Sequence, residues 1–164
     1  MADGSRKQLR HVRAGDVLAT RKGQAPSRVR CVVKAMQTDG MAELVQLPGS
    51  ALLATPWHPL RRKGTQWVFP ANVGTSKRMP CDAVYNLLLE NGSYAVIEGW
   101  ECVTLAHGLS GAVVGHSYYG TEAVVRDLTG MEGWSNGLVV LHPDSVVTRR
   151  DASTGRVTGL LSAN

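Results

Sequence analysis

Thr55 and His58 are the side chains whose types and spacing best fit a chemical role in this sequence. They follow a short apolar run, residues 50–54, whose length and composition predict a buried strand. Pro56 and Pro59 stand beside them, and a proline cannot donate to a sheet and biases the preceding residue toward an extended backbone. We therefore expect a stiff turn at a strand end that holds a hydroxyl and an imidazole close together, as a proton donor requires.

Length and composition indicate one globular domain. The chain has 164 residues, of which 43% are hydrophobic and 19% charged, which suffices for a proper core. The formal net charge of +5 would tolerate acidic partners, but the basic residues are scattered, with tight clusters only at residues 61–63 and 149–150. No aromatic residues alternate with these clusters, so we expect no nucleic-acid partner.

Cysteine usage and hydropathy indicate an intracellular, cytoplasmic protein. Cys31, Cys81 and Cys102 cannot all pair, and none belongs to a C-x-x-C motif, which argues against a disulfide scaffold. No apolar run is long enough to span a membrane, and the N-terminus lacks the apolar stretch of a signal peptide. Cys81, His116 and His142 do not have the spacing of zinc ligands, so we expect neither a metal nor a cofactor.

The order of apolar runs and turn residues predicts an all-β fold with one helix. Hairpins are predicted at Asp39-Gly40 and Asn91-Gly92, and a helix over residues 121–131, with Thr121 as its N-cap and Gly130 at its end. Four tryptophans, Trp57 among them, are expected to close the core. The predicted strands cover residues 8–12, 16–20, 28–36, 41–47, 66–69, 83–90, 94–97, 102–105 and short segments within 137–161.

In this order, the segments resemble the Hint domain, the fold shared by hedgehog autoprocessing domains and inteins. DGSRKQLRHVRAGDVLAT resembles the segment that follows the processing cysteine, and ALLATPWHPLRR resembles the T-x-x-H motif, here Thr55 and His58. VYNLLLENGSYAVIEGWECVTLAHG resembles the C-terminal hairpin of the Hint core. Together with the later HSYYGTEAVVRDLTGMEGW and GLVVL, it is similar to the Vint subgroup, found beside von Willebrand A modules.

The resemblance implies an architecture and partners. The fold would be a Hint-type horseshoe of short antiparallel strands, with a Hint-like core over residues 1–108. Residues 109–164 would form a Vint-type extension carrying the short helix, packed on the core as one structural domain. The expected partners are an upstream domain of the same precursor, of von Willebrand A type, and a small nucleophile or ligand at the extension, where the loop at residues 116–120 precedes the helix.

The resemblance also implies a reaction. A cysteine at the first position of the domain, expected upstream of Met1, would attack the preceding carbonyl and convert the peptide bond to a thioester. His58 would protonate the amide nitrogen, and Thr55 would hold the scissile amide or the oxyanion. Water or another nucleophile would then cleave the thioester. Without the upstream cysteine, the chain as given is expected not to perform this N–S acyl shift.

Two further residues have open roles. Cys102 and His107 lie in one segment and, if it is extended, point to opposite faces. Either they are a core residue and a loop residue, or one of them serves the second step, with His107 as general base for attack on the thioester or Cys102 as a transient acyl acceptor. Ser93 stands where related hairpins often carry histidine, and no His-Asn pair ends the chain, so cleavage is expected rather than splicing. The alternative is an inactive Hint-fold binding or scaffold module of a larger protein.

Overall fold

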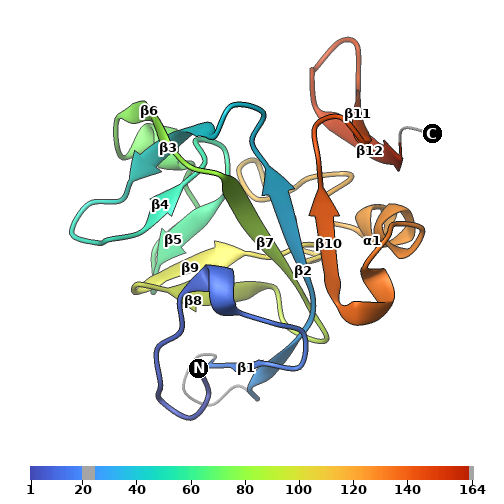
Figure 1. The fold of residues 1–164 in the computed structure, drawn as a ribbon. Helices are drawn as coiled ribbons and strands as arrows, with labels where there is room; N and C mark the ends of the chain where they lie inside the picture. Colours follow the sequence, from blue (N-terminus) through green and yellow to red (C-terminus); the bar gives the residue numbers. More distant parts are fainter. Residues whose placement is uncertain (20–24, 163–164) are drawn as a thin grey trace.

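The computed structural model describes residues 1–19 and 25–162 and shows an all-β fold with one α-helix, as predicted (Figure 1). Three short 3-10 helices, η1 (Leu9–His11), η2 (Pro70–Asn72) and η3 (Trp134–Asn136), lie between strands, and α1 spans Glu122–Thr129. The described strands are β1 (Val17–Leu18), β2 (Ser27–Met36), β3 (Met41–Gln46), β4 (Leu53–Ala54), β5 (Leu60–Arg62), β6 (Ser76–Pro80), β7 (Ala83–Leu89), β8 (Tyr94–Ile97), β9 (Trp100–Val103), β10 (Leu138–Leu141), β11 (Val146–Arg150) and β12 (Val157–Ser162).

Strand β2 is the centre of the largest sheet. β7 pairs with it antiparallel from Val29 to Met36, and β10 pairs with it parallel from Val32 to Ala35. Because both partners use the same stretch of β2, they lie on its opposite edges. β1 joins the first residues of β2 antiparallel. Consecutive buried residues in β2 and β7 show that this part of the sheet is covered on both faces.

Two smaller sheets complete the fold and carry the predicted motif. One has the order β4-β3-β6 and the other β5-β9-β8, all antiparallel. The tight hairpin of the second sheet joins β8 to β9 through Glu98 and Gly99, both with positive φ, at 48° and 80°. Positive φ at both central residues is the geometry of a two-residue hairpin turn.

The two predicted hairpins are wrong as strand pairs, although the chain does turn at both dipeptides. Gly40 and Gly92 have the expected positive φ, but β2 pairs with β7 and not with β3, and β8 pairs with β9 and not with β7. The reason is burial: β2 and β7 each have apolar residues on both faces, so the central sheet buries more apolar surface when these two strands pair.

Three predicted strands are also shorter or different in the structure. Residues 8–12 form η1, residues 66–69 contribute one bridge between Val68 and Leu60, and residues 50–54 contribute only β4. Ser50 accepts a bond from the Leu52 amide through its hydroxyl, so residues 50–52 belong to a turn rather than to a strand. Of the predicted strand at residues 16–20, Thr20 lies outside the described residues.

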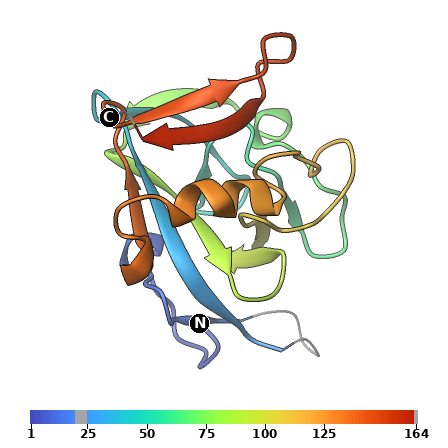
Figure 2. The same cartoon turned by 90° about the vertical axis from the view of Figure 1, so that its right-hand side faces the viewer.

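Residues after position 108 share the core with residues before it. The predicted helix is present: Thr121 caps it, and its buried side chains join the cluster that holds Leu88 and Leu105. Figure 2 shows α1 in front of the layer that contains β2 and β10, with the β11–β12 hairpin beside it. Among the described helices, none is long and apolar enough to cross a membrane. The division at residue 108 stays a prediction.

Candidate active site around His58

The turn that carries His58 is held against strand β9. The His58 amide donates to the Thr55 carbonyl at 3.2 Å, which closes the turn. β5 then begins at Leu60, opposite Cys102, and the Val103 amide donates to the Pro59 carbonyl at 3.2 Å. The backbone after His58 is therefore bound to β9 and its exit, and the imidazole lies beside Val103.

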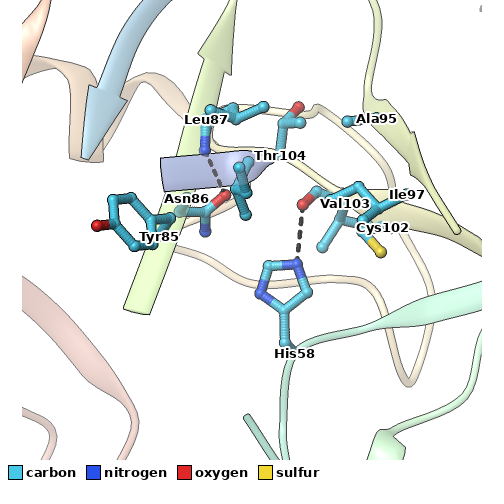
Figure 3. Close-up of a pocket in the computed structure, with 10 residues that line it drawn as sticks. His58, Tyr85, Asn86, Leu87, Ala95, Ile97, Cys102, Val103 and Thr104 are labelled. Carbon is cyan, nitrogen blue, oxygen red and sulfur yellow. Dashed lines mark hydrogen bonds between the residues drawn. The ribbon is translucent and has the colours of Figure 1, made fainter. Parts of the chain in front are cut away.

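The Val103 carbonyl determines the form of the His58 imidazole. His58 Nε2 lies 3.0 Å from the Val103 oxygen, and a carbonyl oxygen can only accept, so Nε2 carries the proton and Nδ1 holds the lone pair. Figure 3 shows Nδ1 on the side of the ring where Asn86 and Tyr85 lie. Burial lowers the pKa of His58, the Val103 bond opposes this, and the charge of His107 lowers it further. The ring is therefore neutral at neutral pH.

A cavity of about 20 Å³ lies next to this ring (Figure 3). Its volume admits a group of about the size of one water molecule. A cavity of this size can enclose a single reacting group, not a whole free substrate. The cavity is lined by His58, Asn86, Cys102 and Thr104 together with Leu9, Tyr85, Leu87, Ala95, Ile97 and Val103.

Asn86 and Thr104 are site residues that the sequence analysis missed. Asn86 Oδ1 accepts the Leu87 amide at 2.8 Å, which fixes the side-chain amide and leaves its NH₂ as a donor. Thr104 is 3% exposed, and its hydroxyl has no hydrogen-bond partner among the described residues. Both residues lie inside the segment that resembles the Hint hairpin, but no spacing singles them out there.

Cys102 lies in the same cavity as His58, with a deeply buried thiol. Burial raises the pKa of Cys102 to about 12. The sulfur lies 3.9 Å from the Trp100 carbonyl and is protonated at neutral pH. The structure thus brings Cys102 and His58 together, but with the thiol in its unreactive form.

Thr55 and His107 do not line this cavity. Thr55 is half-buried, and its carbonyl holds the turn. His107 lies beyond a bend at Ala106, which has a φ of 53°. Its Nδ1 accepts the Leu109 amide at 2.9 Å, and burial lowers its pKa, with the charge of His116 adding to the effect. His107 also lowers the pKa of His58 slightly when its own imidazole is charged.

Trp57 contradicts the prediction that it closes the core. It is 68% exposed, and its ring meets that of Phe69 edge-on, at 5.5 Å between ring centroids. It occupies the position before His58 in the turn, where neighbouring side chains point in different directions, so the packing of His58 inward leaves Trp57 outside. Within residues 1–19 and 25–162, no three histidine, cysteine or acidic side chains gather as metal ligands.

The sequence matches one known family over a range that includes all the residues of this site. The family model described as Vint, Hint-domain, matches residues 1–159. No curated protein gives a match to the sequence. The matched range includes the turn at residues 55–58, the β8–β9 hairpin and nearly all residues after position 108.

Proposed function

Because the chain belongs to the Vint family of Hint domains, we propose that it is a self-processing module that cleaves the peptide bond at its N-terminal junction through a thioester. The observation that carries this proposal is the His58 imidazole, whose Nε2 proton is engaged by the Val103 carbonyl and whose Nδ1 is left for proton transfer beside a small cavity. Such an imidazole can serve first as a base and then as an acid.

The proposed first step moves an acyl group from nitrogen to sulfur. A cysteine at the junction, which the resemblance puts ahead of Met1, attacks the carbonyl carbon of the residue before it. As the sulfur–carbon bond forms, the thiol proton passes to Nδ1 of His58; as the carbon–nitrogen bond breaks, the same proton passes to the amine nitrogen. Between these transfers, the Val103 carbonyl stabilises the imidazolium through Nε2.

The lowered pKa of His58 supports the first transfer. A histidine that is neutral at neutral pH has its lone pair ready for the thiol proton, and its low basicity then makes it a strong acid toward the leaving nitrogen. A permanently charged imidazole would lack the base function. We therefore expect thioester formation to be fastest at pH values where the His58 imidazole is neutral before the reaction.

The other predicted residues take supporting roles in this proposal. Cys102 forms part of the cavity wall. It is not the acyl acceptor of this proposal, because its protonated thiol is a poor nucleophile. His107 is not the general base of this proposal, because its Nδ1 already accepts the Leu109 amide. Thr55 holds the turn through its carbonyl, and a role of its hydroxyl toward the scissile amide stays a prediction. Water or another nucleophile then attacks the thioester and releases the upstream domain.

The test is a fusion of the full chain to an upstream reporter domain that ends in a cysteine junction ahead of Met1. We expect the fusion to release the reporter, and an added thiol to accelerate the release by exchanging with the thioester. His58→Ala should slow the release by about 100-fold or more, as expected for loss of a general acid–base group. Gel analysis over time and the mass of the thiol adduct give the readout.

His58→Gln is the matched control for structure. Its side-chain amide can still donate to the Val103 carbonyl, but it has no ionisable nitrogen, so it should keep the fold and lose the release. If the parent fusion stays intact with thiol, or if His58→Ala releases the reporter at the parent rate, the proposal is wrong. The chain would then fit the alternative, a Hint-fold binding module.

A further inference from the structure

Thr104 carries a buried hydroxyl that the fold leaves without a partner. The residue is 3% exposed, and its Oγ1 is one of only two buried side-chain polar atoms without a hydrogen bond in the described part of the chain. Such an orphan is rare, because a buried hydroxyl that loses water without gaining a partner destabilises the fold. A ligand group that reaches the hydroxyl would remove this deficit.

Two hydrogen bonds hold the backbone around Thr104 in place. The Thr104 amide donates to the Ser93 carbonyl at 3.1 Å, and the Leu105 amide donates to the Leu87 carbonyl at 2.8 Å. These two bonds attach the exit of β9 to residues on either side of it. These bonds hold the backbone of Thr104 in place beside the cavity that the residue lines.

The cavity that Thr104 lines is the one that His58 lines (Figure 3). Two consecutive residues thus line the same space: the Val103 carbonyl orients the imidazole, and Thr104 carries the buried hydroxyl that has no partner. In the N–S acyl shift, the base must reach the amide nitrogen while a donor reaches the carbonyl oxygen of the same peptide bond. A cavity of about 20 Å³ admits that oxygen and little more.

We propose that the Thr104 hydroxyl donates a hydrogen bond to the carbonyl oxygen of the junction peptide bond, a proposal that rests on the self-processing function above. Negative charge develops on this oxygen when the sulfur attacks, so the bond is strongest in the transition state. The hydroxyl keeps its proton throughout. Thr104 therefore supplies the oxyanion support that the T-x-x-H motif led us to expect from Thr55, whose side chain does not line the cavity.

The test compares Thr104→Val with Thr104→Ser in the reporter fusion. Valine keeps the shape of the side chain and removes the hydroxyl, so thioester formation, measured as release at a fixed thiol concentration, should fall by about 100-fold. Serine restores a hydroxyl and should remain within about 10-fold of the parent. Thr158→Val, an exposed threonine of β12, is the matched control and should release the reporter at the parent rate.

Thermal unfolding of the full chain separates this role from a structural one. Because Thr104→Val removes a buried hydroxyl without a partner, its midpoint should equal or exceed that of the parent. A lower midpoint together with slow release would indicate a packing role and overturn the proposal. Release at the parent rate by Thr104→Val would also overturn it, while leaving the proposed function intact. A parent fusion that releases nothing refutes both.

Discussion

The partner of His58 is a backbone carbonyl, and this choice sets the electrostatics of the site. A carbonyl selects the tautomer and the ring orientation, as a carboxylate would, but it adds no full negative charge. The opposing effect of burial is therefore larger, and the pKa of His58 lies below its ordinary value. The imidazole is oriented by Val103 and still neutral at neutral pH.

The buried thiols should be inert in the folded protein. Burial raises the pKa of Cys102 from its ordinary 9.0 to about 12, which reduces its thiolate by about a thousandfold, and burial also raises the pKa of Cys31. Cys81 is only half-buried. We expect iodoacetamide to label Cys81 first, and Cys31 and Cys102 only after unfolding, as mass spectrometry of the labelled peptides would show.

Cys81→Ser provides the control for this labelling. The folded variant should take up almost no label, while the unfolded variant should take up label at both remaining cysteines. Rapid labelling of Cys102 in the folded protein would contradict the protonated state described above. It would make the thiol available again as an acyl acceptor.

Strand β9 and its exit are the element that assembles the site. β5 and β8 pair with it on its two edges, so the turn before β5 brings His58 to Val103, and the strand leads directly into Thr104. The approach of β8 and β9 is set by the turn at Glu98-Gly99. Stability of this hairpin therefore bears directly on the geometry at His58.

Glu98 is an unfavourable residue for its place in this turn. Its φ of 48° is in the left-handed region, which costs most residues with a Cβ atom about 1 kcal/mol and costs asparagine less. We expect Glu98→Asn to raise the free energy of unfolding by up to about 1 kcal/mol, because Asn-Gly is the preferred pair for such a turn. Urea unfolding of the two proteins measures the difference.

Glu98→Ala separates the backbone effect from the loss of charge. The Glu98–Arg6 pair is 3.9 Å apart and exposed, so its loss should change stability very little. Alanine keeps the strained conformation and should give no gain. If alanine stabilises the protein as much as asparagine does, backbone strain is not the cause.

The whole molecule joins the residues after position 108 to those before it. Asp127 of α1 accepts the Tyr118 hydroxyl at 2.8 Å and the Leu160 amide at 2.9 Å through one oxygen, which ties the loop before the helix to β12. β10 completes the sheet around β2, so these late residues build the same core that supports β7 and the cavity.

Three histidines with lowered pKa values, of which His107 is buried and His58 and His116 are half-buried, should make the stability of the molecule depend on pH. Burial is the main cause that lowers the pKa values of His58, His107 and His116. In the unfolded chain, histidine titrates near pH 6.5, so below about 6.5 the unfolded state binds protons that the folded state does not. The free energy of unfolding should therefore fall as the pH drops from about 6.5 toward the lower folded pKa values.

Urea unfolding at a series of pH values across this range measures the effect. Asp16 and Asp151 have lowered pKa values, so their contributions are lost only as the pH falls below about 4. His116→Gln should flatten the histidine-dependent slope, while His142→Gln, at an exposed position, is the control. A stability that rises between about pH 6.5 and 5 would contradict the prediction.

Local features of this molecule were predictable from the sequence because they depend on neighbouring residues. The all-β class follows from short apolar runs between turn residues, and the helix follows from its cap at Thr121 and its apolar face. The Thr55–His58 turn follows from two prolines and its place after a short strand. The family likewise follows from the order of segments that a single chain displays, and the Vint match over residues 1–159 agrees with it.

Strand pairing and the cavity depended on contacts between distant residues. Asn91-Gly92 turns the chain as its residue types predict, but which strands pair was settled by burying both faces of β2 and β7. In the same way, His58 gains its tautomer from Val103, and Thr104 becomes an orphan only once the cavity closes around it. Local residue types report backbone preference, whereas the chemistry at His58 arises from packing between segments that the sequence separates.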